Sequence, residues 1–540
     1  MRIPIASKTG RGRSVPLTAE RIVNMYAEEA PVGSKSPAVL HGCPGLEELI
    51  GIGKLVRGLF TRPSSGELYV VIDRGLYRIT EHFSTDSLGT IGGSGRVGMA
   101  DNGQQLCIAA GKSGYIYTEA DGLKEIEDES FPGASTVTAL DGYFIFSNPN
   151  SGQRGQFFIS SVLDGEVYDA TDFATAESYP DDLMRVFADH SQLLLFGSET
   201  IEIWFNSGNA SFPFTRAQGS VIEQGLGATW TVAKLDETVA WLDNEGSVRM
   251  LQGTTPVRIS THAVEYAISK GDWSKAVAWS YTEEGHQFYV LTVPPGRVRK
   301  FSGYEREEPG IPSTHVYDAA TQLWHERSTY AKGYWRAGFY AKAFGKHVVA
   351  AIDSGRVYEM SLSYYRDANK PIISEIQFPQ VQSDGKRFIV HSLQLDMEVA
   401  TVSEQFDRGG GGGGNGGGGP VESFRAPAAL RGGDAVRDGD GHVKSFGAPA
   451  ALSSRRGRRD DEEEEEPARV PQVMLDVSGN TRTFDQSQAW RSFGGAGEYD
   501  KRVIWRRLGQ HRSFTPKISI SDGVKRAVFA AYAEIEVQGS

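Results

Sequence analysis

The first residues in this sequence whose types suggest chemistry are His262 and Glu265, in the tetrapeptide HAVE. On a helix, a spacing of three places both side chains on one face, where each offers a ligand to a metal ion. A zinc site needs three or four protein ligands, so this pair alone does not complete one. The sequence favours the alternative, a histidine held by a structural hydrogen bond.

Two adjacent carboxylates, Asp181 and Asp182, follow Pro180 and raise the question of glycosidase-type acid–base chemistry. Adjacent residues on a loop usually point apart, and aspartate is common in turns, which favours solvated turn carboxylates. The glycine run at 409–419 has the composition of a phosphate-binding loop, but no Lys-Ser or Lys-Thr follows it. We interpret this run as a linker.

A basic and aromatic stretch, Trp505-Arg506-Arg507, follows Lys501 and Arg502. On a strand, alternation places Arg506 on one side and Trp505 and Arg507 on the other. Such a strand could contact nucleic acid or an acidic partner. Alternatively, it is a strand of a β-sandwich with one solvent-exposed face. The sequence favours the last of these interpretations.

No recognised catalytic motif accompanies these residues. The sequence contains no HExxH zinc motif and no G-x-S-x-G nucleophile elbow. The repeated Ser-x-Asp-x-Gly-x-Thr-Trp turns of sialidase-type propellers are also missing. We therefore expect no enzymatic activity, no cofactor, and no catalytic, cofactor-binding or metal-binding residues.

The elements that position these residues belong to a chain of 540 residues, which is long enough for more than one domain. Its net charge of -12 argues against tight gripping of nucleic acid, which depends on Lys and Arg, but not against DNA sliding past. The two cysteines, Cys43 and Cys107, do not make a disulfide framework. Because we find neither a membrane-spanning run nor a secretory signal, we expect a soluble chain made in a cytoplasm.

The segment Trp241–Glu265 has the pattern of a short antiparallel meander, in which apolar, β-prone runs are separated by turns. The same pattern occurs seven times from Leu55 onward, and the second run, such as Leu193–Phe196, is always the most apolar. The first strands of the units begin at residues 56, 96, 136, 184, 231, 276 and 336. This repetition predicts an all-β fold with a β-propeller of about seven four-stranded blades over residues 55–380. A large β-sandwich or a pair of barrels is the alternative.

Two segments depart from the repeat. Residues 1–54 form an N-terminal arm, which either lies extended against a neighbouring surface or packs on its own domain. Residues 294–314, between the second and third strands of the sixth unit, form a long surface loop rich in Pro, Gly and charge. Loops of this length are usually functional or disordered.

Residues 381–540 are expected to form a C-terminal β-sandwich, interrupted by a flexible, glycine-rich, low-complexity insert at 402–469. One long strand, 386–401, precedes the insert, and it must pair with the strands after the insert because it would otherwise leave an open sheet edge. Those later strands begin at residues 471, 502, 516 and 524. The insert buries too little apolar area to offset its ordering entropy.

Several stretches together give the sequence a family resemblance. They include RIVNMYAEE (21–29), LFGSETIEIWFNSG (195–208), FPFTRAQGSVIEQG (212–225) and RVIWRRLGQHR (502–512). With them, the chain resembles the packaged-DNA stabilisation or tail-hub (nozzle) proteins of short-tailed bacteriophages. The insert at 402–469 departs from the family, so nothing is carried over to it.

The resemblance implies a structural head-tail connector protein in the tail of a virion, assembled in the cytoplasm of a bacterial host. Its relatives form a homo-hexameric ring below the portal and its tail adaptor. That ring retains packaged double-stranded DNA, lets it pass through the lumen at genome ejection, and offers surfaces to tail fibres, spikes or a tail needle. An acidic lumen would repel DNA and let it pass. The alternative function is a carbohydrate-binding or receptor-binding propeller module on the virion.

Overall fold

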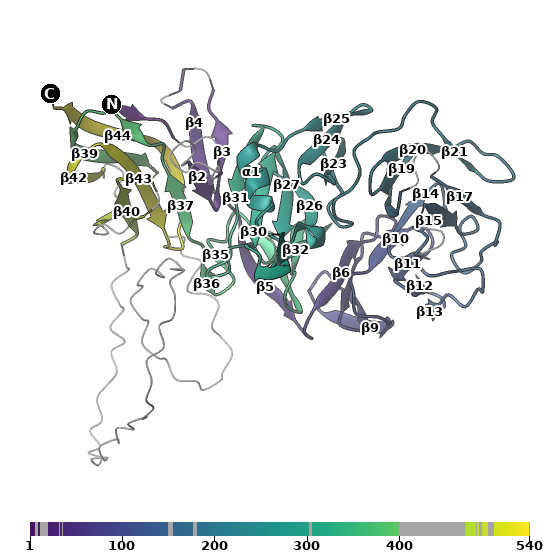
Figure 1. Cartoon of the computed structure of the whole chain (residues 1–540). Coiled ribbons are helices and arrows are strands. Elements are labelled where there is room, and N and C mark those ends of the chain that lie inside the picture. Colours follow the sequence, from purple (N-terminus) through teal and green to yellow (C-terminus); the bar gives the residue numbers. More distant parts are fainter. Residues whose placement is uncertain are drawn as a thin grey trace, which may run out of the picture. The chain divides into compact units, whose positions relative to one another are not determined.

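The computed structural model describes most of the chain outside the insert (Figure 1). The described residues are 1–5, 9–10, 20–31, 33–34, 36–149, 155–176, 181–301, 305–398, 470–481, 483–484, 489–494 and 502–538. The chain divides into one compact unit, Met1–Val402 with Val470–Ser540, and a second unit, Ser403–Arg469. The second unit contains nearly all of the expected insert and lies outside the described residues, as does the glycine run.

Four antiparallel meanders of four strands each make up the first half of the described chain. They are β6 (Val56–Thr61), β7 (Leu68–Ile72), β8 (Gly75–Ile79) and β9 (Thr85–Thr90); β10 (Gly98–Asp101), β11 (Leu106–Ala110), β12 (Ser113–Thr118) and β13 (Gly122–Glu125); β14 (Val137–Leu140), β15 (Tyr143–Ser147), β16 (Gln156–Ile159) and β17 (Phe173–Thr175); and β18 (Leu183–Asp189), β19 (Gln192–Gly197), β20 (Ile201–Asn206) and β21 (Phe214–Arg216). Each second strand is fully or almost fully buried, which explains its continuous apolar run.

Three more meanders follow, and the last one draws on the N-terminal region. They are β22 (Ala233–Leu235), β23 (Thr238–Leu242), β24 (Val248–Gln252) and β25 (Thr255–Arg258); β26 (Val277–Glu283), β27 (His286–Val293), β30 (Ser313–Asp318) and β31 (Leu323–Glu326); and β32 (Ala337–Ala343), β33 (Lys346–Ala351), β34 (Arg356–Ser361) and β5 (Gly45–Gly51), with β35 (Arg366–Asp367) and β36 (Lys370–Pro371) beyond β5. Helix α1 (His262–Ile268) and the short 3-10 helix η1 (Trp273–Lys275) connect the fifth and sixth meanders.

Seven apolar clusters lie between consecutive meanders and close them into a ring. In one of them, Tyr69 and Val71 of the first meander pack with Leu106 and Ile108 of the second. The last cluster packs Phe339 of the seventh meander against the first meander, so the seventh and first units are neighbours. Clusters of this kind confirm the seven-bladed β-propeller and exclude the alternative of a pair of barrels.

The ring is closed by a strand from the region that sequence analysis placed in the N-terminal arm, residues 1–54. Strand β5 pairs antiparallel with β34, with Ile50 opposite Val357 and Leu46 opposite Met360. The pairing leaves no room for a side chain at Gly45, where a Cβ atom would lie 2.2 Å from the backbone oxygen of Tyr364. The fourth strand of the seventh blade therefore comes from the opposite end of the propeller sequence.

The C-terminal β-sandwich consists of two sheets, and N-terminal strands contribute to both. One sheet contains β1 (Arg2–Ile3), β3 (Met25–Glu29), β4 (Ala38–Gly42), β44 (Ala527–Val537), β39 (Phe388–Met397) and β42 (Val503–His511); the other contains β2 (Arg21–Val23), β37 (Ser374–Gln377), β43 (Ser513–Ile520), β40 (Gln472–Ser478), β41 (Ala489–Ser492) and β38 (Val381–Gln382). Buried Leu393, Trp505 and Ile518 belong to the core between them. Strand β39 pairs with β42 and β44, which confirms that the strand before the insert joins those after it.

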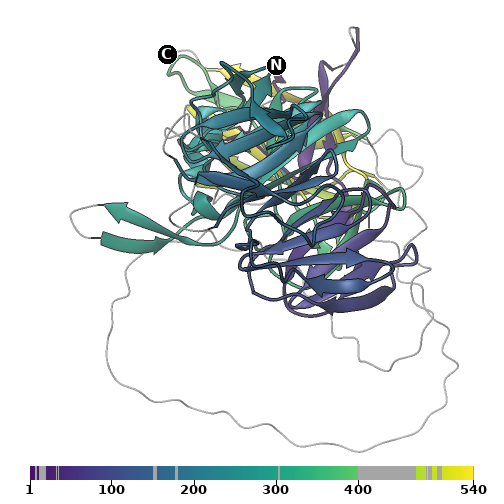
Figure 2. The same cartoon turned by 90° about the vertical axis from the view of Figure 1, so that its right-hand side faces the viewer.

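The predicted long surface loop at 294–314 contains regular structure. It contains a two-stranded antiparallel hairpin of β28 (Arg297–Phe301) and β29 (Glu305–Pro309). Figure 2 shows this hairpin projecting from the blade that carries it. At its base, the backbone N–H of Gly310 donates a 2.9 Å hydrogen bond to the Gly296 carbonyl. None of the helices in the described ranges is long and apolar enough to span a bilayer.

We predict that Gly45→Ala destabilises the propeller by about 1–3 kcal/mol, because the added methyl group must displace backbone atoms rather than a flexible side chain. Urea unfolding followed by tryptophan fluorescence measures the change. Gly95→Ala is the matched control, because nothing lies within 4 Å of a Cβ atom at that position. Equal stabilities of the two variants would contradict the tight closure of β5 on the seventh blade.

Candidate functional site at the joint of propeller and sandwich

Strand β2 connects the propeller to the sandwich by pairing with both. On one side, Val23 pairs in parallel with Glu326 of β31, the outermost strand of the sixth blade. On the other side, β2 pairs antiparallel with β37, with Ile22 opposite Ile376. The result is one continuous ten-stranded sheet that runs from the sixth blade into the sandwich. In a protein without a catalytic motif, such a joint is the candidate functional site because it fixes the geometry of the whole unit.

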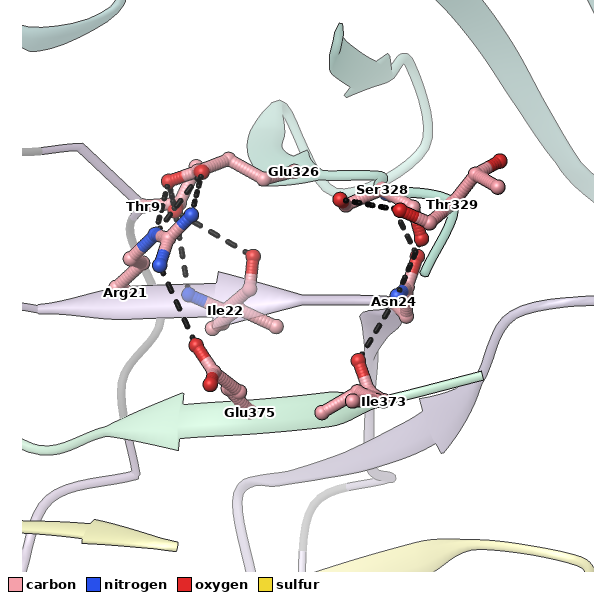
Figure 3. Close-up of polar contacts among 9 residues, drawn as sticks. All are labelled: Thr9, Arg21, Ile22, Asn24, Glu326, Ser328, Thr329, Ile373 and Glu375. Atoms are coloured by element: carbon pink, nitrogen blue, oxygen red, sulfur yellow. Dashed lines mark hydrogen bonds and ion pairs between the residues drawn. The ribbon is translucent and has the colours of Figure 1, made fainter. Parts of the chain in front are cut away.

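The side chain of Arg21 ties β2 to both neighbours (Figure 3). Its Nη2 and Nε donate hydrogen bonds of 2.7 Å and 2.9 Å to Oε2 of Glu326. Its Nη1 lies 3.3 Å from Oε2 of Glu375 on β37. The hydroxyl of Thr9 donates to Oε1 of Glu326 at 3.2 Å. The planar guanidinium suits this role because it presents several donors in a fixed geometry.

A second clamp in the same joint is formed by Asn24, which is buried and has a φ of 56°. Asparagine tolerates this left-handed conformation better than most residues. Its Nδ2 donates to the carbonyl oxygens of Ser328 at 3.0 Å and Ile373 at 2.8 Å, and its Oδ1 accepts from the Ser328 N–H at 3.0 Å. Figure 3 shows this amide lying between the segment that follows β31 of the sixth blade and the residue that precedes β37 of the sandwich.

The electrostatics of the joint favour charged Glu326 and neutral histidines. Burial alone would raise the pKa of Glu326, but the charge and hydrogen bonds of Arg21 outweigh it and lower the pKa to about 2. Burial lowers the pKa of His315 and, together with Arg327, that of His325 to about 3. Neither ring nitrogen of His315 has a hydrogen-bond partner among the described residues. These groups support the structure and offer no exposed acid–base pair.

The structure places His262 and Glu265 on the first turn of α1, on one face as expected. The Glu265 carboxylate accepts hydrogen bonds of 2.6 Å from Arg258 Nε and 2.6 Å from Ser260 Oγ. The Nδ1 atom of His262 lies 3.0 Å from Arg258 Nη2. Across the described ranges, no group of three or more His, Cys, Asp or Glu side chains is arranged to hold a metal ion.

The Asp181 carboxylate accepts hydrogen bonds from the backbone of a neighbouring turn. Its Oδ2 accepts from the N–H groups of Glu199 at 2.9 Å and Thr200 at 2.8 Å. Asp182 is exposed, and its carbonyl accepts from the Ser198 N–H at 2.9 Å. Both residues therefore hold a turn of the fourth blade in place.

The predicted alternation at Trp505-Arg506-Arg507 is wrong at its last residue. Trp505 is buried, and its Nε1 donates to the Ala489 carbonyl at 2.8 Å. Arg506 and Arg507 are both exposed, although alternation placed Arg507 on the side of Trp505. Arg507 has a φ of 60°, and the register between β42 and β39 shifts at this point. A β-bulge thus turns a second arginine outward. Lys501 lies outside the described residues.

Sequence reasoning missed Arg21, Asn24 and Glu326 as the residues of the joint. The available signal was the pattern of 21–29, in which two short apolar runs are separated by Asn24. That pattern predicts two strands with a break between them, but it does not identify their partners.

We predict that Glu326→Gln lowers the free energy of unfolding by about 2 kcal/mol, because a half-buried arginine loses the closer of its two charged partners. Chemical denaturation at neutral pH measures the loss. Glu398→Gln is the matched control, since Glu398 pairs with Lys525 on the surface and should change stability by less than about 1 kcal/mol. A loss no larger than that of the control would show that the Arg21 contacts do not stabilise the joint.

The same pair makes stability depend on pH. The folded-state pKa of Glu326 lies below its ordinary value of 4.5, so its contribution is complete above about pH 5 and is lost as pH falls toward about 2. We expect the wild-type protein to lose up to about 3 kcal/mol more stability than Glu326→Gln over this range. Unfolding curves at several pH values measure the difference, and contributions of the buried histidines largely cancel because both proteins contain them. Parallel pH profiles would contradict the prediction.

Comparison with known proteins identifies two family matches. A family model described as bacteriophage P22 Gp10, β-propeller, matches residues 1–364, and one described as bacteriophage P22 Gp10, β-sandwich, matches residues 453–536. A search of curated proteins gives no match.

Two solved structures illustrate the distant similarities. The Pan2 WD40 domain of Neurospora crassa is 8% identical, with 57% of this chain and 89% of that chain covered and a TM-score of 0.37. BamB from Moraxella catarrhalis is 10% identical, with 62% and 93% covered and a TM-score of 0.36. These similarities are too distant to bear on function. The family models, in contrast, match more than half of this chain, which therefore belongs to the phage stabilisation family of bacteriophage P22 Gp10 and is a structural protein of a phage virion.

Proposed function

We propose that this protein is the tail nozzle of a short-tailed phage, in which six copies form a ring that extends the portal channel. The ring retains packaged DNA and lets it leave at infection. The observation that carries the proposal is the match of both Gp10 family models, one to the propeller and one to the sandwich. A head-to-tail contact between copies closes such a ring when its rotation divides a full turn evenly.

The side chains at the centre of the propeller favour a genome channel that is enclosed by several copies over one that runs through a single propeller. The Arg96 guanidinium of the second blade lies 4.1 Å from the ring centroid of Phe339 in the seventh blade. It also lies 5.0 Å from the ring centroid of Trp230, at the start of the fifth blade. Side chains of the second, fifth and seventh blades thus lie close together, which argues against passage of a duplex through a single propeller. The genome channel of this proposal is bounded by the outer surfaces of neighbouring subunits.

The joint at β2 supports the same proposal mechanically. A ring under pressure from packaged DNA needs subunits whose two domains do not separate. Backbone pairing of β2 with β31 and β37, together with the Arg21 and Asn24 contacts, resists such separation. We also propose that the ring binds the tail adaptor and offers surfaces to tail fibres, spikes or a tail needle. The net charge of -12 also suits a lumen through which DNA slides.

We expect the β28–β29 hairpin to narrow the channel. Because Gly296 and Gly310 are already hydrogen bonded, a two-residue Asn-Gly turn can replace residues 297–309 without disturbing β27 or β30. Virions carrying this shortened protein should release DNA that becomes accessible to nuclease, while wild-type virions retain theirs. The number of subunits bound to the adaptor-capped portal, measured by native mass spectrometry, should remain six.

A control variant with an Asn-Gly turn in place of Asp121-Gly122, in the exposed turn between β12 and β13, should retain DNA normally. Normal retention by the hairpin variant would reject the hairpin as the constriction. A subunit count other than six would reject the ring. If virions without this protein keep their DNA and only lose attachment to cells, the receptor-binding alternative is correct instead.

A further inference from the structure

Four of the seven innermost strands of the propeller carry an arginine near their start, and the charges of two of these arginines are compensated by oxygen atoms of the protein. Arg57 donates hydrogen bonds to several backbone carbonyls, including those of Gly95 at 2.7 Å and Gly92 at 2.8 Å. The Nε atom of Arg336 lies 3.3 Å from Oδ1 of Asp367. Both residues show how this fold compensates a buried cation, through carbonyl oxygens or through a carboxylate.

The other two arginines, Arg96 and Arg185, both lie close to the ring of Trp230 and lack such compensation. The Cζ of Arg185 lies 5.3 Å from the ring centroid of Trp230, whose ring is also 5.0 Å from the Cζ of Arg96. Arg96 donates one hydrogen bond, to the Gly338 carbonyl at 3.3 Å. Arg185 donates one, to the Thr229 carbonyl at 3.0 Å. A guanidinium has five N–H donors, so most donors of both side chains have no protein acceptor in the described structure.

The charges around these two arginines are unbalanced. Within the described part of the chain, neither arginine forms an ion pair with a carboxylate, and each keeps part of its surface accessible to solvent. Burial lowers the pKa of Arg96 to about 9, and the neighbouring charge of Arg185 contributes to the decrease. Burial likewise lowers the pKa of Arg185 to about 10, against a smaller opposing effect of Tyr289. The aromatic rings attract both cations, but they cannot use the free N–H donors.

We propose that the centre of the propeller is a binding site for one small inorganic oxyanion, of the phosphate class, held between Arg96 and Arg185 beside Trp230. An oxyanion accepts several hydrogen bonds in the geometry of a guanidinium fork and balances two positive charges at once. Trp230 and Phe339 restrict the space on the axis, which favours a compact anion over a nucleic-acid strand.

Such an anion acts as a structural pin. Arg96 belongs to the second blade, Arg185 to the fourth, Trp230 to the fifth and Phe339 to the seventh. A bound anion therefore connects blades that do not touch along the ring, in addition to the apolar clusters between neighbours. This inference concerns one subunit alone and does not depend on the proposed ring of six.

Isothermal titration of the full-length protein with sodium phosphate, in sodium chloride of matched ionic strength, tests the proposal. The wild-type protein should bind one phosphate per chain and should unfold at a higher temperature when phosphate is present. Arg96→Met and Arg185→Met should each raise the Kd for phosphate at least about tenfold, and phosphate should no longer raise the unfolding temperature of either variant. Arg506→Met, which changes an exposed arginine of β42, should leave both quantities unchanged.

Arg96→Lys and Arg185→Lys provide a second test that does not depend on folding of the methionine variants. Lysine keeps the positive charge but lacks the planar fork of donors. Both lysine variants should have a higher Kd for phosphate and the same circular dichroism spectrum as the wild-type protein. Absence of phosphate binding to the wild-type protein would overturn the proposal. An equal Kd in Arg96→Lys and Arg506→Met, or tighter binding of acetate than of phosphate, would also overturn it.

Discussion

The pairing of β2 with two strand edges at once is the constraint on which the rest of the structure depends. The outer strand of the sixth blade and β37 of the sandwich would each leave unpaired N–H and C=O groups without it. One short segment satisfies both edges, and this turns two β domains into a single compact unit. The side chains of Arg21 and Asn24 add hydrogen bonds from β2 to Glu326 and Ser328, beyond those of backbone pairing. For a structural protein of a virion, such a joint keeps the two β domains together.

Much of the propeller could be predicted because blade strands carry a strong local signal. The Leu193–Phe196 run is buried on both faces, so it loses alternation and identifies the middle of a blade. The seventh blade has three strands that follow one another in the sequence, and its fourth strand, β5, lies more than 300 residues earlier than its partner β34. No local pattern could connect Ile50 with Val357. The outward turn of Arg507 was also out of reach, because it depends on a bulge in the register with β39 rather than on composition.

The joint was harder to predict than the fold for the same reason. Arg21 and Glu326 are separated by 305 positions, and neither occurs in a motif that indicates the other. By contrast, the helical spacing of Glu265 and the loop position of Asp181 could be read from nearby sequence, although their hydrogen-bond partners could not. Sequence reasoning thus succeeded where interactions are local and failed where they close a long loop. The central arginines belong to the second class, since only the circular arrangement brings Arg96 to Trp230.

The closing strand β5 and the hairpin of β3 and β4 have a consequence for synthesis. A ribosome makes these strands first, but their partners β34 and β44 emerge late, the latter near the C-terminus. The beginning of the chain must therefore wait, with its hydrogen-bonding groups in water, until the end is translated, and contacts of such long sequence separation form slowly. A product that terminates before β44 lacks the strand with which β4 pairs. Such a product cannot complete the sandwich sheet and leaves the edge of β4 unpaired.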